Sequence, residues 1–155
     1  MDRIRFSPTD NSDIEYVGAN LRESDLREIK EWYGVNEDPV DALRRSVDRS
    51  QAQTATTAAG EPVAIFGVAP ISLLGDMASP WMLATKKAEQ YPRELICEGR
   101  RITAEWAVTY GTLVNRIGVH NARAIRWLRR IGFEVHKPLT LDADFLLFER
   151  THSNS

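Results

Sequence analysis

The most chemically distinctive stretch of the sequence is a run of arginines between residues 121 and 133. Arg123, Arg126 and Arg130 are spaced three and four residues apart, so on a helix their guanidinium groups would share one face, with Trp127 beside them. An arginine stripe with an aromatic side chain can bind phosphate or nucleic acid, and both residue types also anchor protein interfaces. A solvated helix face explains the pattern equally well. The net charge of −2 makes general nucleic-acid affinity unlikely.

A second group of side chains could transfer protons. Glu105 and Tyr110 lie in a stretch with helical spacing, and Glu105 is next to Trp106, which is expected to face the core. A half-buried carboxylate with a raised pKa could act as a base, although an exposed helical glutamate is the commoner state. His120 could be a base or a ligand, but it could equally make a loop hydrogen bond. We treat all three as weak catalytic candidates.

The remaining reactive side chains show no arrangement typical of a reaction. His136 and His152 are isolated in the sequence, so the spacing predicts no metal site. The serines and Cys97 lack a recognisable nucleophile motif. A single cysteine cannot form an internal disulfide, which fits a reducing compartment.

Length and composition indicate one soluble globular domain. The chain has 155 residues, of which 43% are hydrophobic and 27% charged. We expect a single domain over residues 1–150 and a short polar tail over 151–155. The sequence shows no signal peptide and no stretch of about 20 apolar residues that could span a membrane. Residues 1–48 hold 12 acidic and 7 basic side chains, whereas residues 86–130 hold 4 and 10. This polarity predicts either two solvated faces or a surface that docks to charged partners or to copies of itself.

The order of the expected elements predicts an α/β fold with a mixed central sheet flanked by helices. Ser24 or Asp25 is expected to cap the second helix, and Gly34 to end it. Residues 51–59 could be a linker or an edge strand, and residues 72–80 read as a loop. The expected strands cover residues 4–6, 51–68 (a hairpin), 81–84, 113–119, 133–135 and 145–148, and the expected helices cover residues 14–21, 24–33, 39–47, 92–110 and 121–131.

The stretch from Asn121 to Phe133 resembles the fourth-helix motif of the GNAT acyltransferase superfamily. Asn121 caps the helix, the small Ala124 allows close approach to the sheet, Gly132 permits a left-handed turn and Phe133 enters the core. The order of elements matches that fold over nearly the whole chain. Within this fold the sequence more closely resembles a GNAT-like group of internal virion or morphogenesis proteins of short-tailed phages. The similarities are loose and lie at Asn20–Arg22, Asp25, Glu28, Pro62–Val68, Pro80–Trp81 and the helix from Asn121 to Phe133.

The GNAT resemblance implies two features by which an acetyltransferase can be recognised. The first is a glycine-containing loop after the central strand, which binds the pyrophosphate of acetyl-CoA. Here that loop has no glycine, and Lys86, Lys87 and Asn121 are only weak cofactor-binding candidates. The second feature is a tyrosine that protonates the leaving thiolate. Leu128 stands at that position and cannot donate a proton.

These two departures favour a protein that is not an enzyme and needs no cofactor. The phage resemblance then implies a role in virion assembly or as a minor internal virion component. The expected location is the host cytoplasm during assembly, or the virion itself. The expected partners are other phage structural proteins or a second copy of the chain, with no membrane involved. The expected interaction residues are Arg123, Arg126, Trp127 and Arg130. The alternative is an N-acetyltransferase that uses acetyl-CoA through a diverged pyrophosphate loop.

Overall fold

The computed structural model describes residues 3–72, 76–138, 140 and 142–152. The chain divides into two compact units, which are described separately. Unit 1 comprises residues 1–69 and 81–94, and unit 2 comprises residues 70–80 and 95–155. The strands are hydrogen-bonded in the order β1-β2-β3-β4-β5-β7-β6, and β4 contributes residues to both units. The fold is therefore α/β with a mixed seven-stranded sheet, as the sequence predicts. No helix among the described residues is long and apolar enough to cross a membrane.

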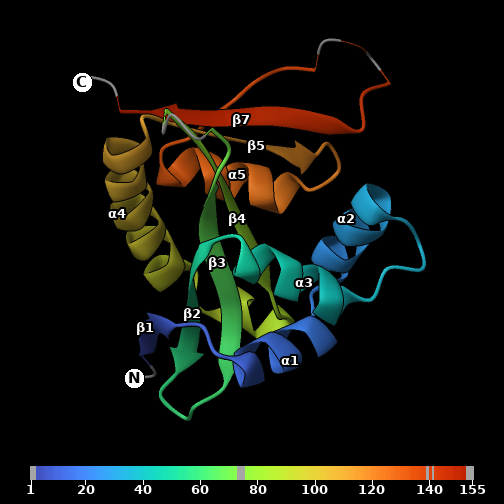
Figure 1. Ribbon diagram of the computed structural model, residues 1–155, viewed down its shortest axis with the longest axis vertical. Coiled ribbons are helices and arrows are strands. Elements are labelled where there is room, and N and C mark those ends of the chain that lie inside the picture. Colours follow the sequence, from blue (N-terminus) through green and yellow to red (C-terminus); the bar gives the residue numbers. More distant parts are fainter. Residues whose placement is uncertain (1–2, 73–75, 139, 141, 153–155) are drawn as a thin grey trace. The chain divides into compact units, whose positions relative to one another are not determined.

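Unit 1 holds an antiparallel group of strands and three helices that pack beside it (Figure 1). Ile14, Val17, Leu43 and Ile65 form its apolar centre. Gly18 lets α1 approach α3, since a Cβ there would lie 2.8 Å from Cγ2 of Val40. Its elements are β1 (Ile4–Pro8), α1 (Asn11–Ala19), α2 (Glu23–Tyr33), α3 (Pro39–Asp48), β2 (Gln51–Thr57), β3 (Pro62–Pro70), the second half of β4 (Met77–Ala84) and the 3₁₀ turn η1 (Lys86–Gln90).

Unit 2 places two helices with the remaining strands, and β5 and β7 run side by side in Figure 1. Phe133 and Phe148 pack edge to face with ring centroids 5.1 Å apart. The predicted helix motif is confirmed in detail: the Asn121 side chain accepts from the Ala124 N–H, and Gly132 ends the helix with a φ of 113°. The elements of unit 2 are α4 (Pro92–Tyr110, from Leu95 onward), β5 (Thr112–Gly118), α5 (Ala122–Ile131), β6 (Glu134–Val135) and β7 (Phe145–Thr151).

Several predicted boundaries differ from the structure, and tertiary contacts explain the differences. Residues 51–57 form a strand paired on both sides, so they are neither a linker nor an edge. The expected loop over 72–80 is wrong at its end, because β4 begins at Met77 and pairs with β5; residues 73–75 lie outside the described part. Thr151, which we assigned to the tail, is the last residue of β7, and residues 153–155 are outside the description.

Candidate active site

The end of β4 is fixed in place by the short segment that joins α1 to α2. The first helix was expected to extend to Leu21, but it ends at Ala19, and Leu21 instead forms a β-bridge with Thr85. The Arg22 N–H donates to the Ala84 carbonyl at 2.8 Å, and the Thr85 N–H donates to the Val63 carbonyl at 2.8 Å. The backbone at the carboxyl end of the strand is therefore held by neighbours from two other segments.

A buried ion pair reinforces this attachment. Asp25 is 3% exposed, and its carboxylate accepts from Nε and Nη2 of Arg22 at 3.0 and 2.9 Å. The same carboxylate accepts from the Ala84 N–H at 2.9 Å. Burial raises the pKa of Asp25, while the Arg22 charge and the Ala84 hydrogen bond oppose that shift. We name this arrangement of Arg22, Asp25 and Ala84 the β4 lock.

The prediction that Ser24 or Asp25 caps α2 is wrong. The helix begins at Glu23, and its N-cap residue, Arg22, makes no side-chain capping bond. Asp25 lies within the first turn and points to the strand instead. A carboxylate three residues after an arginine is the only signal in the sequence that could have indicated this ion pair.

The segment that follows β4 carries the two lysines predicted to contact a cofactor. Lys86 is exposed and Lys87 half-buried, and both lie in η1. The 19-residue helix α4 begins just beyond, with Pro92 at its start. A helix N-terminus carries a partial positive charge and free N–H groups. This segment therefore joins two ammonium groups to a helix start, although it also carries the carboxylates of Glu89 and Glu94.

Asn121, the third cofactor-binding candidate, lies in unit 2 and not in the η1 segment. Its side-chain oxygen accepts from the Ala124 N–H at 3.2 Å as the N-cap of α5. The structure therefore gives it a structural role in the helix.

The three catalytic candidates occupy separate settings. Glu105 is exposed and forms an ion pair with Arg101 at 2.9 Å, so the half-buried state considered for it is not found. Tyr110 is the half-buried last residue of α4. It lies five residues after Glu105, about 140° further around the helix, so the two side chains leave different sides. His120 is exposed in the turn before α5.

The arginine stripe is present, but its tryptophan does not belong to the exposed face. Arg123, Arg126 and Arg130 are exposed on α5, as the spacing predicts. Trp127 is half-buried and packs toward Gly99 of α4, where a Cβ would lie 3.4 Å from the indole. Its Nε1 is buried and has no hydrogen-bond partner in the part of the chain that the structure describes. Leu128 is 6% exposed, so the position of the family's tyrosine faces the core here.

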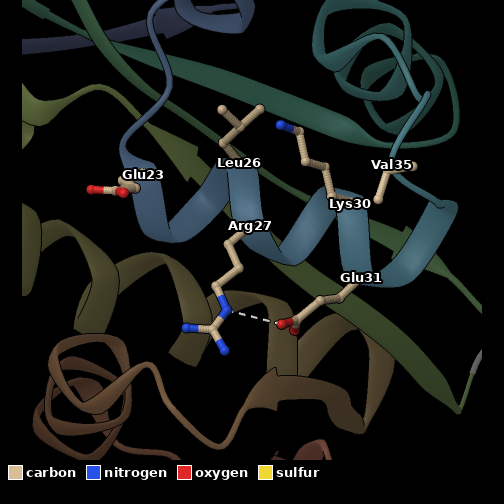
Figure 2. A pocket seen from close by; sticks show the side chains of 6 residues that line it. All are labelled: Glu23, Leu26, Arg27, Lys30, Glu31 and Val35. Atoms are coloured by element: carbon tan, nitrogen blue, oxygen red, sulfur yellow. Dashed lines mark hydrogen bonds and ion pairs between the residues drawn. The ribbon is translucent and has the colours of Figure 1, made fainter.

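One surface depression lies along α2 (Figure 2). It has a volume of about 510 Å³. Two of the residues that line it, Arg27 and Glu31, form an ion pair, with Nε 2.9 Å from Oε1. The side chains that line it are Glu23, Leu26, Arg27, Lys30, Glu31 and Val35.

Comparison with known proteins identifies the fold. No family model and no curated protein sequence matches this chain. Solved structures do match over nearly its full length. A spermidine N-acetyltransferase from Vibrio cholerae in complex with CoA and spermine is 10% identical to this chain. The alignment covers 96% of this chain and 95% of that one, with a TM-score of 0.71. A GNAT superfamily phosphinothricin acetyltransferase from Sinorhizobium meliloti in complex with acetyl-CoA is 12% identical, with 96% and 88% covered and a TM-score of 0.69. A GNAT-family acetyltransferase from Streptococcus pneumoniae is 13% identical, with 97% and 100% covered and a TM-score of 0.65.

The chain therefore has the GNAT acetyltransferase fold, as the Asn121–Phe133 motif predicts. The prediction of a non-catalytic phage assembly protein is wrong, because the structures that match nearly the whole chain are acetyltransferases, and the first two hold CoA or acetyl-CoA. Nothing in these comparisons supports a virion component. The fold is shared with these acetyltransferases at 10–13% identity.

Proposed function

We propose that this protein is an N-acetyltransferase that transfers the acetyl group of acetyl-CoA to an amine. The observation that carries the proposal is the segment directly after β4, in which Lys86 and Lys87 lie just ahead of the start of α4. The fold supports it, since solved structures that match nearly the whole chain include N-acetyltransferases with CoA or acetyl-CoA bound.

The missing glycines change how the pyrophosphate is bound. A glycine loop uses converging backbone N–H groups. In η1 some of these groups are already engaged, since the Ala88 N–H donates to the Thr85 carbonyl and the Tyr91 N–H to the Ala88 carbonyl. Lys86 and Lys87 then supply the positive charge, and the dipole of α4 adds to it. The β4 lock keeps the start of this segment fixed.

Transfer of the acetyl group to the amine does not require a side chain that protonates the leaving thiolate. The amine nitrogen attacks the thioester carbonyl carbon, the C–N bond forms, the C–S bond breaks and the amine loses a proton to a base. The leaving thiol has a pKa of about 8–9, so the thiolate departs at neutral pH and takes its proton from water. Leu128 in place of a tyrosine is compatible with this step, which then runs without an acid on α5.

The test is binding and turnover of acetyl-CoA by the full chain. Isothermal titration should give a micromolar dissociation constant, about −8 kcal/mol. The double variant Lys86→Glu/Lys87→Glu should bind at least about tenfold more weakly, because two attractive charges become repulsive. Lys137→Glu, an exposed lysine of unit 2, is the control and should bind as the parent does.

Turnover is measured as free thiol released when acetyl-CoA is mixed with a panel of primary amines, including polyamines and amino-acid analogues. Amine-dependent release that falls in the double variant supports the proposal. The proposal is abandoned if the parent shows no binding at millimolar acetyl-CoA and no amine in the panel raises thiol release.

A further inference from the structure

An unassigned cluster of metal-ligating side chains lies on the last two strands of the sheet order. Glu134 and His136 are two residues apart and so project from the same face of the chain. The register places Glu134 directly opposite Glu149, and the His136 N–H donates to the Leu147 carbonyl at 2.8 Å. The three side chains therefore share one face of the β6–β7 pair. The spacing in the sequence does not indicate this cluster, because Glu149 lies 13 residues away from His136 and only the strand register brings the two close.

The three side chains are neighbours, and the imidazole lies between the two carboxylates. Nε2 of His136 lies 2.7 Å from Oε1 of Glu149, and the other ring nitrogen, Nδ1, lies 4.0 Å from Oε1 of Glu134. An ion binds only one ring nitrogen, so it would replace one of these two contacts. One donor atom from each residue can be chosen so that all three lie within 4.8 Å of one another. Tetrahedral zinc, with bonds of about 2.0–2.2 Å, needs donors roughly 3.4 Å apart. The exposed Glu134 side chain can close that gap by rotating.

The charges at this face also favour a cation. Like charges directly opposite each other on paired strands are destabilising, and Glu134 faces Glu149 in that way. The opposite face of the same strands is apolar, with Phe148 packed against Phe133. The backbones that carry the three ligands are thus fixed, while the ligands themselves remain half-buried or exposed and can be reached from solvent.

We propose that Glu134, His136 and Glu149 form a binding site for a divalent transition-metal ion of the zinc type at the β6–β7 edge. One imidazole and two carboxylates suit zinc, cobalt or manganese better than calcium, which prefers oxygen ligands only. Water completes the coordination. Because β6 is only two residues long, an ion held by both strands ties it to β7 and stabilises the folded state. The site is independent of the proposed acetyl transfer.

The experiment uses the full chain without an affinity tag, first stripped with a chelator. Titration with ZnCl₂ should show one ion bound per chain, and CoCl₂ should give visible d–d absorption of a coordinated cobalt ion. His136→Gln and Glu149→Gln should each weaken zinc binding at least about tenfold. Removing a side chain that only orients a metal ligand already lowers metal affinity by that much, and removing the ligand itself should lower it at least as far. Glu134→Gln should weaken it less, because that side chain is the most exposed of the three.

His152→Ala is the matched control, since it removes an exposed histidine outside the cluster. Binding must survive in this variant and fall in His136→Gln. Thermal unfolding followed with and without zinc gives a second reading: the ion should raise the Tm of the parent and of His152→Ala but not that of His136→Gln. The proposal is overturned if the stripped parent binds no zinc at millimolar concentration, or if binding is equal in the parent and in both ligand variants. A misfolded variant is recognised by its circular dichroism, and Glu149→Gln then serves in place of His136→Gln.

Discussion

Each unit of the molecule contains one arginine whose guanidinium group is held inside the fold by hydrogen bonds, Arg22 in unit 1 and Arg150 in unit 2. The two arginines differ in the partners that accept these hydrogen bonds. In the β4 lock, Arg22 faces the carboxylate of Asp25, which also accepts from the Ala84 N–H. In unit 2, Arg150 donates to the Thr103 hydroxyl at 2.7 Å and to the Ile131 carbonyl at 2.8 Å. The first arginine has an opposite charge, whereas the second has neutral acceptors.

This difference shows how burial acts on charge in each unit. In unit 1 burial disfavours the ionised carboxylate: it raises the pKa of Asp25 even though Arg22 lies against it. In unit 2 burial lowers the pKa of Arg150. The buried pair of unit 1 is therefore costly to break by removing one charge. The contribution of Arg150 to stability depends instead on the space around its guanidinium group and on its neutral hydrogen-bond acceptors.

The largest expected effect is the loss of the carboxylate in the β4 lock. Asp25→Ala leaves the half-buried Arg22 without its partner and the Ala84 N–H without its acceptor. Breaking a buried pair in this way costs about 3–5 kcal/mol. Urea unfolding of the variant should show that loss in the free energy of unfolding, with an unchanged m-value. A loss below about 1 kcal/mol would mean that the pair contributes only as a surface ion pair does.

The second effect tests the space around Arg150. Gly132 has a φ of 113°, and a Cβ there would lie 2.9 Å from Nη1 of Arg150. We expect Gly132→Ala to lower the free energy of unfolding by about 2–4 kcal/mol, from backbone strain of about 1–3 kcal/mol plus the collision. Gly60→Ala is the control, since its φ of 93° gives strain but no atom lies within 4 Å.

The collision can be measured separately by a double-mutant cycle. In an Arg150→Ala background the excess cost of Gly132→Ala over Gly60→Ala should disappear, because the guanidinium is gone. An excess that persists would place its cause in the backbone conformation at residue 132 and not in the contact with Arg150.

The two arginine sites also mark the limit of prediction from the sequence. Asn121, Gly132 and Phe133 identified helix α5 and the fold correctly, because capping and the left-handed turn depend only on local sequence. Asp25 was misread as a cap, since its role depends on a strand 59 residues away. Contacts of that range are set by the sheet, and no local pattern encodes them.

The same limit applies to the candidate site. Lys86 and Lys87 could be placed after β4 from the order of elements alone, and the structure places them there. The missing glycines were visible too, and cofactor binding through the lysines instead stays a prediction, because a glycine loop is one way to bind phosphate and not the only one. The cluster of Glu134, His136 and Glu149 required the β6–β7 register and could not be predicted.

A smaller effect concerns the pH dependence of the two aspartates in unit 1. The folded-state pKa of Asp25 lies above its ordinary value of 3.8 because the carboxyl group is buried. Its contribution to stability is therefore fully present below the unfolded pKa and is lost as pH rises through the folded pKa. The free energy of unfolding of the parent, relative to Asp25→Asn, should fall as pH rises above about 4.

Asp10 should show the opposite sign. The Asp13 N–H and then the Ser12 hydroxyl, both donating to its carboxylate, lower the pKa of Asp10. Its contribution is present above the unfolded pKa and is lost as pH falls, so the parent relative to Asp10→Asn should lose stability on acidification. If the free energy of unfolding changed with pH in the same direction in both comparisons, burial could not be the cause of the pKa shift at Asp25.

The smallest effect is expected one turn along α2 from the β4 lock, at the pair in the surface depression. Arg27 and Glu31 join the same two kinds of charged group as Arg22 and Asp25, with a separation of 2.9 Å in both cases (Figure 2). Their side chains, however, are 58% and 37% exposed, against 14% and 4% in the lock. Water screens the exposed pair, and an arginine placed before its glutamate is the weaker order on a helix. Glu31→Ala should therefore cost no more than about 0.5 kcal/mol, and that loss should vanish in 1 M salt, where the Debye length is about 3 Å. A salt-independent loss above about 1 kcal/mol would show that the exposed pair stabilises the fold as strongly as a buried pair can. Burial would then not explain why the Arg22–Asp25 pair of the β4 lock should contribute more than the Arg27–Glu31 pair.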